Sequence, residues 1–131
     1  MNKEEKELLL RDLCNRLPYN VMCQVEFKED GKYNSKVMLL SGIFADEAYF
    51  TTKGGSIYSN EYKPYLFPLS SMTEEEQRTL DSMCNGVEMV SRLSGLKMFD
   101  KAFNWLNENH FDYRGLIEKG LAIDATDKNI Y

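Results

Sequence analysis

The chain has little of the chemistry that most enzymes and metal sites require. Its 131 residues include one histidine, one tryptophan and three prolines, and its three cysteines, Cys14, Cys23 and Cys84, are odd in number and widely spaced. Such spacing argues against a disulfide framework and against a zinc site. No Asn-x-Ser/Thr acceptor for glycosylation occurs. We therefore expect no metal, no cofactor and a reducing compartment.

Long apolar runs are also missing. The longest uninterrupted apolar stretch, residues 37–40, is far shorter than the roughly 18 residues that a membrane-spanning helix needs. Residues 1–5 lack the basic and then apolar order of a secretion signal. The sequence therefore predicts a cytoplasmic protein that does not act in a membrane.

Basic side chains are too few and too dispersed for a nucleic-acid-binding face. The chain carries 16 basic and 21 acidic side chains, a formal net charge of -5, with both signs spread along its length. Domains that bind nucleic acid usually gather Lys and Arg on one face, where these residues displace counterions from the phosphates. We expect no nucleic-acid partner.

The remaining composition is typical of one globular domain covering residues 1–131. Hydrophobic residues make up 43% and charged residues 28%, which is ordinary for a soluble fold. Apolar spacing and capping signals predict helices at residues 3–16, from Thr73 onward and at residues 97–109. Alternating apolar residues and glycine turns predict strands at residues 21–27, 35–44, 48–52 and 56–58. Residues 87–93 fit helix and strand equally well.

This order of elements predicts an α+β fold. We expect an antiparallel meander of three to four strands packed against an N-terminal helix and two C-terminal helices. On the first helix, Leu10, Leu13, Cys14 and Leu17 are predicted to form the buried face. Each of the three cysteines then lies on an apolar face and is predicted to be a small buried hydrophobe.

Aromatic side chains gather around the prolines in the middle of the chain. The rings in this stretch are Tyr58, Tyr62, Tyr65 and Phe67, and Pro64 and Pro68 hold the segment extended. Rings on a stiff segment offer a large contact area at low entropic cost, as a recognition surface requires. Alternatively, the rings cover the core as the segment crosses the sheet, which is the usual place of tyrosine.

The second candidate site surrounds the only histidine. The side chains of His110, Asp112, Tyr113 and Arg114 lie close together in the sequence. An imidazole oriented by a carboxylate can act as a general base, and an arginine can hold an anionic ligand. Helix termination explains the same residues, with Asp112 as a cap and with Arg114 stacked on a ring or paired with a carboxylate.

One further set of segments is informative as a group: Lys63-Pro64-Tyr65-Leu66, Thr73-Glu74-Glu75, Trp105-Leu106-Asn107 and His110-Phe111-Asp112-Tyr113-Arg114-Gly115-Leu116-Ile117. Together these segments resemble a family of small uncharacterised proteins of anaerobic gut bacteria and of their phages and mobile elements. The resemblance covers most of the chain and implies no established activity, cofactor or catalytic residue. A mobile-element origin implies an accessory or host-modulating binder.

The sequence therefore favours a non-catalytic intracellular module that binds a protein partner through the Tyr58–Phe67 segment. The alternative is a small-ligand-binding protein or an enzyme built around His110, Asp112, Tyr113 and Arg114. Exposure of the tyrosine rings would support the first hypothesis, and a cavity on which the four side chains converge would support the second.

Overall fold

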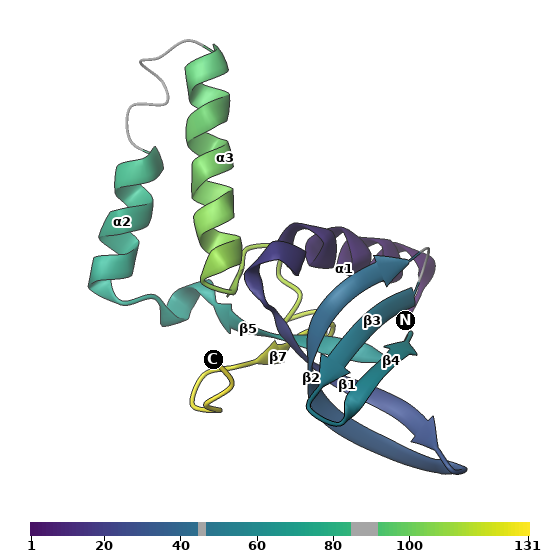
Figure 1. Cartoon of the computed structure of the whole chain (residues 1–131). Coiled ribbons are helices and arrows are strands. Elements are labelled where there is room, and N and C mark those ends of the chain that lie inside the picture. Colours follow the sequence, from purple (N-terminus) through teal and green to yellow (C-terminus); the bar gives the residue numbers. More distant parts are fainter. Residues whose placement is uncertain (45–46, 85–91) are drawn as a thin grey trace.

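The computed structural model describes residues 1–44, 47–84 and 92–131 and has the predicted α+β architecture (Figure 1). In chain order the elements are α1 (Lys3–Arg16), η1 (Leu17–Tyr19), β1 (Met22–Glu29), β2 (Lys32–Phe44), β3 (Glu47–Thr52), β4 (Gly55–Ser59), β5 (Tyr62–Pro68), η2 (Leu69–Ser71), α2 (Glu74–Cys84), α3 (Arg92–Glu108), β6 (Phe111–Asp112) and β7 (Ile123–Asp124). Most of the ambiguous segment 87–93 lies outside the described residues, and its last two residues belong to α3.

The sheet contains the predicted meander and extends beyond it. Strands β1 to β4 pair with their sequence neighbours in antiparallel fashion, in the spatial order β4-β3-β2-β1. Strand β5 then adds to the other side of β1, where Tyr62–Pro64 pair with Cys23–Val25. The short strands β6 and β7 both pair with β5 in parallel. The sheet is therefore mixed, because the C-terminal part of the chain returns to cover the outer edge of β5.

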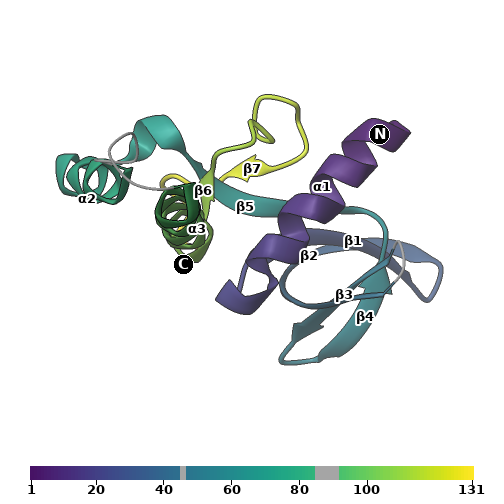
Figure 2. The same ribbon diagram turned by 90° about the horizontal axis from the view of Figure 1, so that it is seen from above.

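Strong curvature turns this sheet into an incompletely closed barrel. A register shift between Leu40 and Gly42 interrupts the pairing of β2 with β3, and such a bulge bends a strand. The meander curls until Cα atoms of β4 and β1 come within 8 Å of each other. At the C-terminal end of β4, the hydroxyl of Ser59 donates to the carbonyl oxygen of Glu26 at 2.9 Å. Figure 2 shows the curl, with α1 lying across β1 and β2.

Helix α1 buries a face that only partly matches the predicted one. Leu9 and Leu13 are buried in the core, together with Asp12 and Arg16. Of the predicted face, Leu13 is buried and Leu17 packs against the core, whereas Leu10 is half-buried and Cys14 is exposed. The buried face is therefore rotated about the helix axis from the predicted one. Apolar spacing fits both faces, and only the mutual neutralisation of Asp12 and Arg16 makes the observed one possible.

Helices α2 and α3 form a hairpin beside the sheet rather than a layer over it (Figure 1). Thr73 begins α2 as predicted, because Glu76 N donates to Thr73 Oγ1 at 3.1 Å and Thr73 N donates to a Glu76 carboxylate oxygen at 3.0 Å. On α3, Phe99 and Phe103 stay 43% and 46% exposed. In the described ranges, none of the helices is both long enough and apolar enough for a bilayer span.

The three cysteines differ in their surroundings. Cys23 on β1 is buried as predicted, but Cys14 on α1 and Cys84 at the end of α2 are exposed. Burial, reinforced by the charge of Asp12, raises the pKa of the Cys23 thiol above its ordinary value. Cys23 therefore behaves as a core hydrophobe, and the prediction of burial is wrong for the other two cysteines.

Candidate functional site

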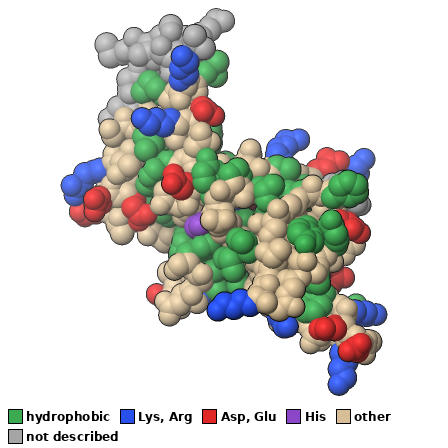
Figure 3. Space-filling model, in the orientation of Figure 1, with side chains coloured by type: hydrophobic (Ala, Val, Ile, Leu, Met, Phe, Trp, Pro, Cys, Tyr) green, Lys and Arg blue, Asp and Glu red, His purple; other side chains and the backbone are tan. Residues whose placement is uncertain are grey.

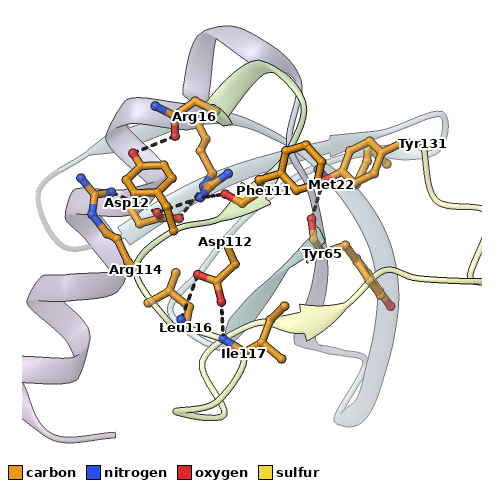
Figure 4. A network of polar contacts seen from close by, with 12 residues as sticks. Asp12, Arg16, Met22, Tyr65, Phe111, Asp112, Arg114, Leu116, Ile117 and Tyr131 are labelled. Atoms are coloured by element: carbon orange, nitrogen blue, oxygen red, sulfur yellow. Dashed lines mark hydrogen bonds and ion pairs between the residues drawn. The ribbon is translucent and has the colours of Figure 1, made fainter. Parts of the chain in front are cut away.

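The charged residues near the predicted second site form a buried clasp between α1 and the C-terminal segment (Figure 4). Arg16 Nε donates to Asp12 Oδ2 at 2.7 Å, and neither side chain is exposed. Arg16 Nη2 also donates to the Phe111 carbonyl oxygen at 2.7 Å. Arg114 Nη1 donates to Asp12 Oδ1 at 3.0 Å, and the Arg114 guanidinium lies 4.9 Å from the centre of the Tyr113 ring. The predicted fastening role of Arg114 is confirmed.

Asp112 serves the backbone rather than a ligand. Its two carboxylate oxygens accept hydrogen bonds from the backbone N–H groups of Leu116 and Ile117, each at 2.9 Å. The residue is 7% exposed. Asp112 therefore caps the turn that follows it, as the helix-termination interpretation predicts.

His110 is held by an aromatic stack. It lies in the turn after α3, in a left-handed conformation with φ of 62°, and its ring stacks on Tyr131 at a centroid distance of 3.7 Å. The Tyr131 hydroxyl donates to Tyr65 O at 2.7 Å and accepts from Met22 N at 3.0 Å. Burial first, and then the positive charge of Arg16, lower the pKa of His110 to about 4, so its imidazole is neutral at pH 7.

The cleft at His110 does not include the other three residues of the second candidate site. A cleft of about 390 Å³ is lined by His110, Phe67, Phe111, Tyr131 and neighbouring residues, but not by Asp112, Tyr113 or Arg114. Among the residues in the described ranges, no group of three or more His, Cys, Asp or Glu side chains could hold a metal ion. Asp112 and Arg114 instead contact the backbone of residues 116–117 and the carboxylate of Asp12.

The aromatic segment is only partly a surface. Tyr62 and Tyr65 are 6% and 7% exposed, whereas Tyr58 is 57% exposed. Phe67 is half-buried and contacts Phe111 and Tyr131 at centroid distances of 6.2 and 5.9 Å. Tyr62 packs in the core against Phe50 at a centroid distance of 5.2 Å, and the Tyr65 hydroxyl donates to Gln24 Oε1. The four rings thus do not form one exposed patch, and Tyr62 and Tyr65 follow the alternative in which the rings cover the core.

Tyr58 instead lies beside a gap between two strand edges, the first of which belongs to β1. The two-residue turn between β1 and β2 is closed by Glu29 and Lys32, and the closing pair of such a turn is hydrogen-bonded across the hairpin. Because hydrogen-bonded pairs alternate, the backbone groups of Glu26 and Lys28 point away from β2. The bond from Glu26 N to Glu61 O at 2.9 Å agrees with this alternation. Lys28 directs its N–H and C=O into the gap.

The second edge belongs to β4. Thr52 and Gly55 close the turn between β3 and β4, so the same alternation directs the backbone groups of Ser56 and Tyr58 away from β3. In the part of the chain that the structure describes, no group hydrogen-bonds to the outward N–H or C=O of either residue. We call the gap between residues 26–29 of β1 and 55–59 of β4 the β1–β4 seam.

The seam has an apolar floor and an aromatic rim. Phe27 and Ile57 are half-buried and pack against the core, and Met38 lies beside them. Two adjoining hollows of about 270 and 280 Å³ share Phe27, Lys28 and Ile57 in their linings. Tyr33 and Tyr58, at 67% and 57% exposed, stand at the rim. Figure 3 shows hydrophobic side chains exposed over the curled sheet and charges of both signs at the protruding β1–β2 end.

Sequence reasoning did not find the seam. The two turns, at Asp30-Gly31 and Lys53-Gly54, indicate which backbone groups of each hairpin point outward. Nothing local indicates that β4 curls back toward β1, because this approach depends on the curvature of the whole sheet.

The chain matches no protein-family model, and it shows no significant similarity to a curated protein or to a solved structure. The functional argument therefore rests on the geometry of the seam.

Proposed function

We propose that this protein is a non-catalytic protein-binding module that accepts an extended segment of its partner in the β1–β4 seam. The observation that carries the proposal is the pair of strand edges, with the backbone groups of Lys28, Ser56 and Tyr58 directed into one gap. An extended peptide satisfies such groups by adding a strand to the sheet, and pockets for its alternate side chains give specificity. The resemblance to proteins of mobile elements suggests an accessory role.

The shape of the seam limits the segment that fits. A strand between β1 and β4 separates them by roughly 9.6 Å, twice the usual strand spacing. At Ser59 the two strands are already joined by the hydrogen bond to Glu26 O, so the added strand fits only beyond this point, along residues 55–58. We propose that the bound segment runs antiparallel to β4. Strand β4 directs the backbone N–H and C=O groups of two residues into the seam, whereas β1 directs only those of Lys28.

The rim favours recognition of protein side chains. The Tyr58 ring lies against Tyr49 at a centroid distance of 4.8 Å, and the Tyr49 hydroxyl donates to Ser56 Oγ at 2.6 Å. A ring held in this way loses little conformational entropy on binding. The apolar floor at Phe27 and Ile57 would take the inward-facing side chain of the segment.

A library of displayed random ten-residue peptides tests the proposal. Peptides selected on the full chain are measured against Ser56→Ala and Ser56→Pro, which both lack the hydroxyl group and differ in the outward backbone N–H. We expect Ser56→Ala to bind nearly normally and Ser56→Pro to bind roughly tenfold more weakly, as loss of about one edge hydrogen bond implies. Urea unfolding first verifies that both variants fold.

A change in the peptide gives a second result that does not depend on variant folding. Methylating the peptide nitrogen that faces β4 should weaken binding to the unaltered chain by a similar factor, because that nitrogen loses its hydrogen. Equal binding by both Ser56 variants together with tolerance of N-methylation would refute strand addition. Enrichment of no peptide would refute the binding function.

A further inference from the structure

The two hollows of the seam carry opposite net charge. The hollow over residues 54–57 has the charged lining residues Lys28, Lys36 and Glu29, and two positive charges with one negative give +1. The hollow over residues 57–61 is lined by Lys28, Glu26 and Glu61, and one positive charge with two negative gives −1. The net charge of the seam thus changes from positive at the Gly55 end to negative at the Ser59 end.

The lysine ammonium groups are available to a partner. In the described ranges Lys28 and Lys36 form no ion pair. Each instead lies over an aromatic ring, with Lys28 Nζ 5.0 Å from the centre of Tyr33 and Lys36 Nζ 5.8 Å from that of Phe27. A cation over a ring gains modest stabilisation and keeps its charge, so a carboxylate from a partner can still pair with it.

Lys36 faces the core side of the seam and has room beside it. It is paired with Val25, which is buried, and opposite residues in an antiparallel pair share a face. Gly55 has no side chain, and a Cβ placed there would meet nothing within 4 Å. An inward side chain of the bound segment opposite Gly55 can therefore approach Lys36.

We propose that the seam selects its segment by charge order, with a basic residue first, an apolar residue next and an acidic residue last. The proposal rests on the proposed function. Strand β4 runs from Gly55 to Ser59, so an antiparallel segment enters at the Ser59 end and leaves at the Gly55 end. Its first residue, opposite Tyr58, faces Glu26 and Glu61. The residue opposite Ile57 contacts the floor, and the residue opposite Gly55 faces Lys36.

A second copy of this chain is a poorer occupant. Strand β4, Gly55–Ser59, contains no charged residue. Pairing of β4 with β4 of another copy would thus supply neither the basic nor the acidic group that the hollows require. A foreign segment with the stated charge order satisfies both hollows.

Two peptides of identical composition test the order. The first is acetyl-Ser-Lys-Val-Thr-Glu-Ser-amide, and the second, acetyl-Ser-Glu-Val-Thr-Lys-Ser-amide, exchanges the two charged residues. Each is titrated into the ¹⁵N-labelled full chain at low salt, and amide shifts of Lys28, Ser56 and Tyr58 are followed by NMR. We expect the first peptide to bind roughly fivefold to tenfold tighter, since several partly exposed charge pairs change sign. At 1 M salt, where the Debye length is about 3 Å, the difference should disappear.

Charge reversal on the protein supplies a matched pair of variants. Lys36→Glu changes the charge of its hollow and should abolish or invert the preference. Lys53→Glu makes the same change of charge in the neighbouring turn, outside the lining of both hollows. This variant should keep the preference for the first peptide.

The outcomes separate the two proposals. Equal binding of both peptides, or tighter binding of the second, with shifts at Ser56 and Tyr58 would overturn the charge order and leave strand addition standing. Shifts elsewhere or no binding would overturn both. Shifts at these amides that grow with protein concentration in the absence of peptide would identify a second copy as the occupant and also overturn the charge order.

Discussion

Replacing Asp12 by alanine should destabilise the fold more than most surface changes can. The substitution leaves the guanidinium of Arg16 fully buried, with the carbonyl oxygen of Phe111 as its remaining hydrogen-bond acceptor and the Tyr113 ring 5.4 Å away. Its Nη1 already has no hydrogen-bond partner in the described part of the chain. Arg114 loses the same carboxylate. Removing one partner of a buried ion pair costs about 3–5 kcal/mol, a large part of the roughly 5–15 kcal/mol by which domains are stable.

The chain contains a matched exposed pair for comparison. Glu74 and Arg78 have the same spacing on α2 as Asp12 and Arg16 on α1, but their side chains are 95% and 77% exposed and 3.5 Å apart. Exposed pairs of this kind contribute about 0.5 kcal/mol or less. Glu74→Ala therefore controls for loss of a helical ion pair without burial.

Urea unfolding followed by circular dichroism measures both variants. We expect the midpoint of Asp12→Ala to fall far below that of Glu74→Ala, which should stay near the unaltered chain. Arg16→Met should lose less than Asp12→Ala, because Asp12 keeps its bond to Arg114. Similar losses for Asp12→Ala and Glu74→Ala would refute the conclusion that the clasp is buried and unsolvated.

Three further results follow from the fold. The pKa of His110 is about 4 when folded and 6.5 when unfolded, so acid protonates the unfolded chain first. The free energy of unfolding should therefore fall by roughly 1 kcal/mol between pH 7 and pH 5, after discounting for solvent screening. This loss should be smaller in His110→Asn. Ellman's reagent should modify Cys14 and Cys84 quickly in the native chain, and Cys23 after unfolding, because only Cys23 is buried. Thr73→Ala should cost about 1 kcal/mol by removing the α2 cap, as thermal unfolding can measure.

Local signals in the sequence predicted most of the elements. The Asp30-Gly31 turn, the alternation from Val21 to Phe27 and the capping box at Thr73 each depend on residues within a few positions, and each appears in the structure. The added strands β6 and β7 are only two residues long and pair with a distant partner. Such pairing leaves no periodic signal.

The sites were harder to predict than the elements. Tyr62 is buried against Phe50 in the core, and Tyr65 lies against Gln24 and Tyr131, and only long-range packing decides this. Local chemistry predicts Asp112 as a cap and Arg114 as a fastener, and both contacts are present in the structure. The seam depends on curvature that brings β4 to β1, so its residues appear unrelated until the sheet is seen whole.

Amide hydrogen exchange of the labelled chain tests the seam most directly. In the free protein, the outward N–H groups of Lys28, Ser56 and Tyr58 should exchange quickly, whereas Ile57, which is bonded to β3, should be protected. A selected peptide should slow exchange at Ser56 and Tyr58 and leave Ile57 almost unchanged. Protection of Ser56 and Tyr58 in the free protein, or peptide-induced protection confined to another surface, would contradict strand addition at the seam.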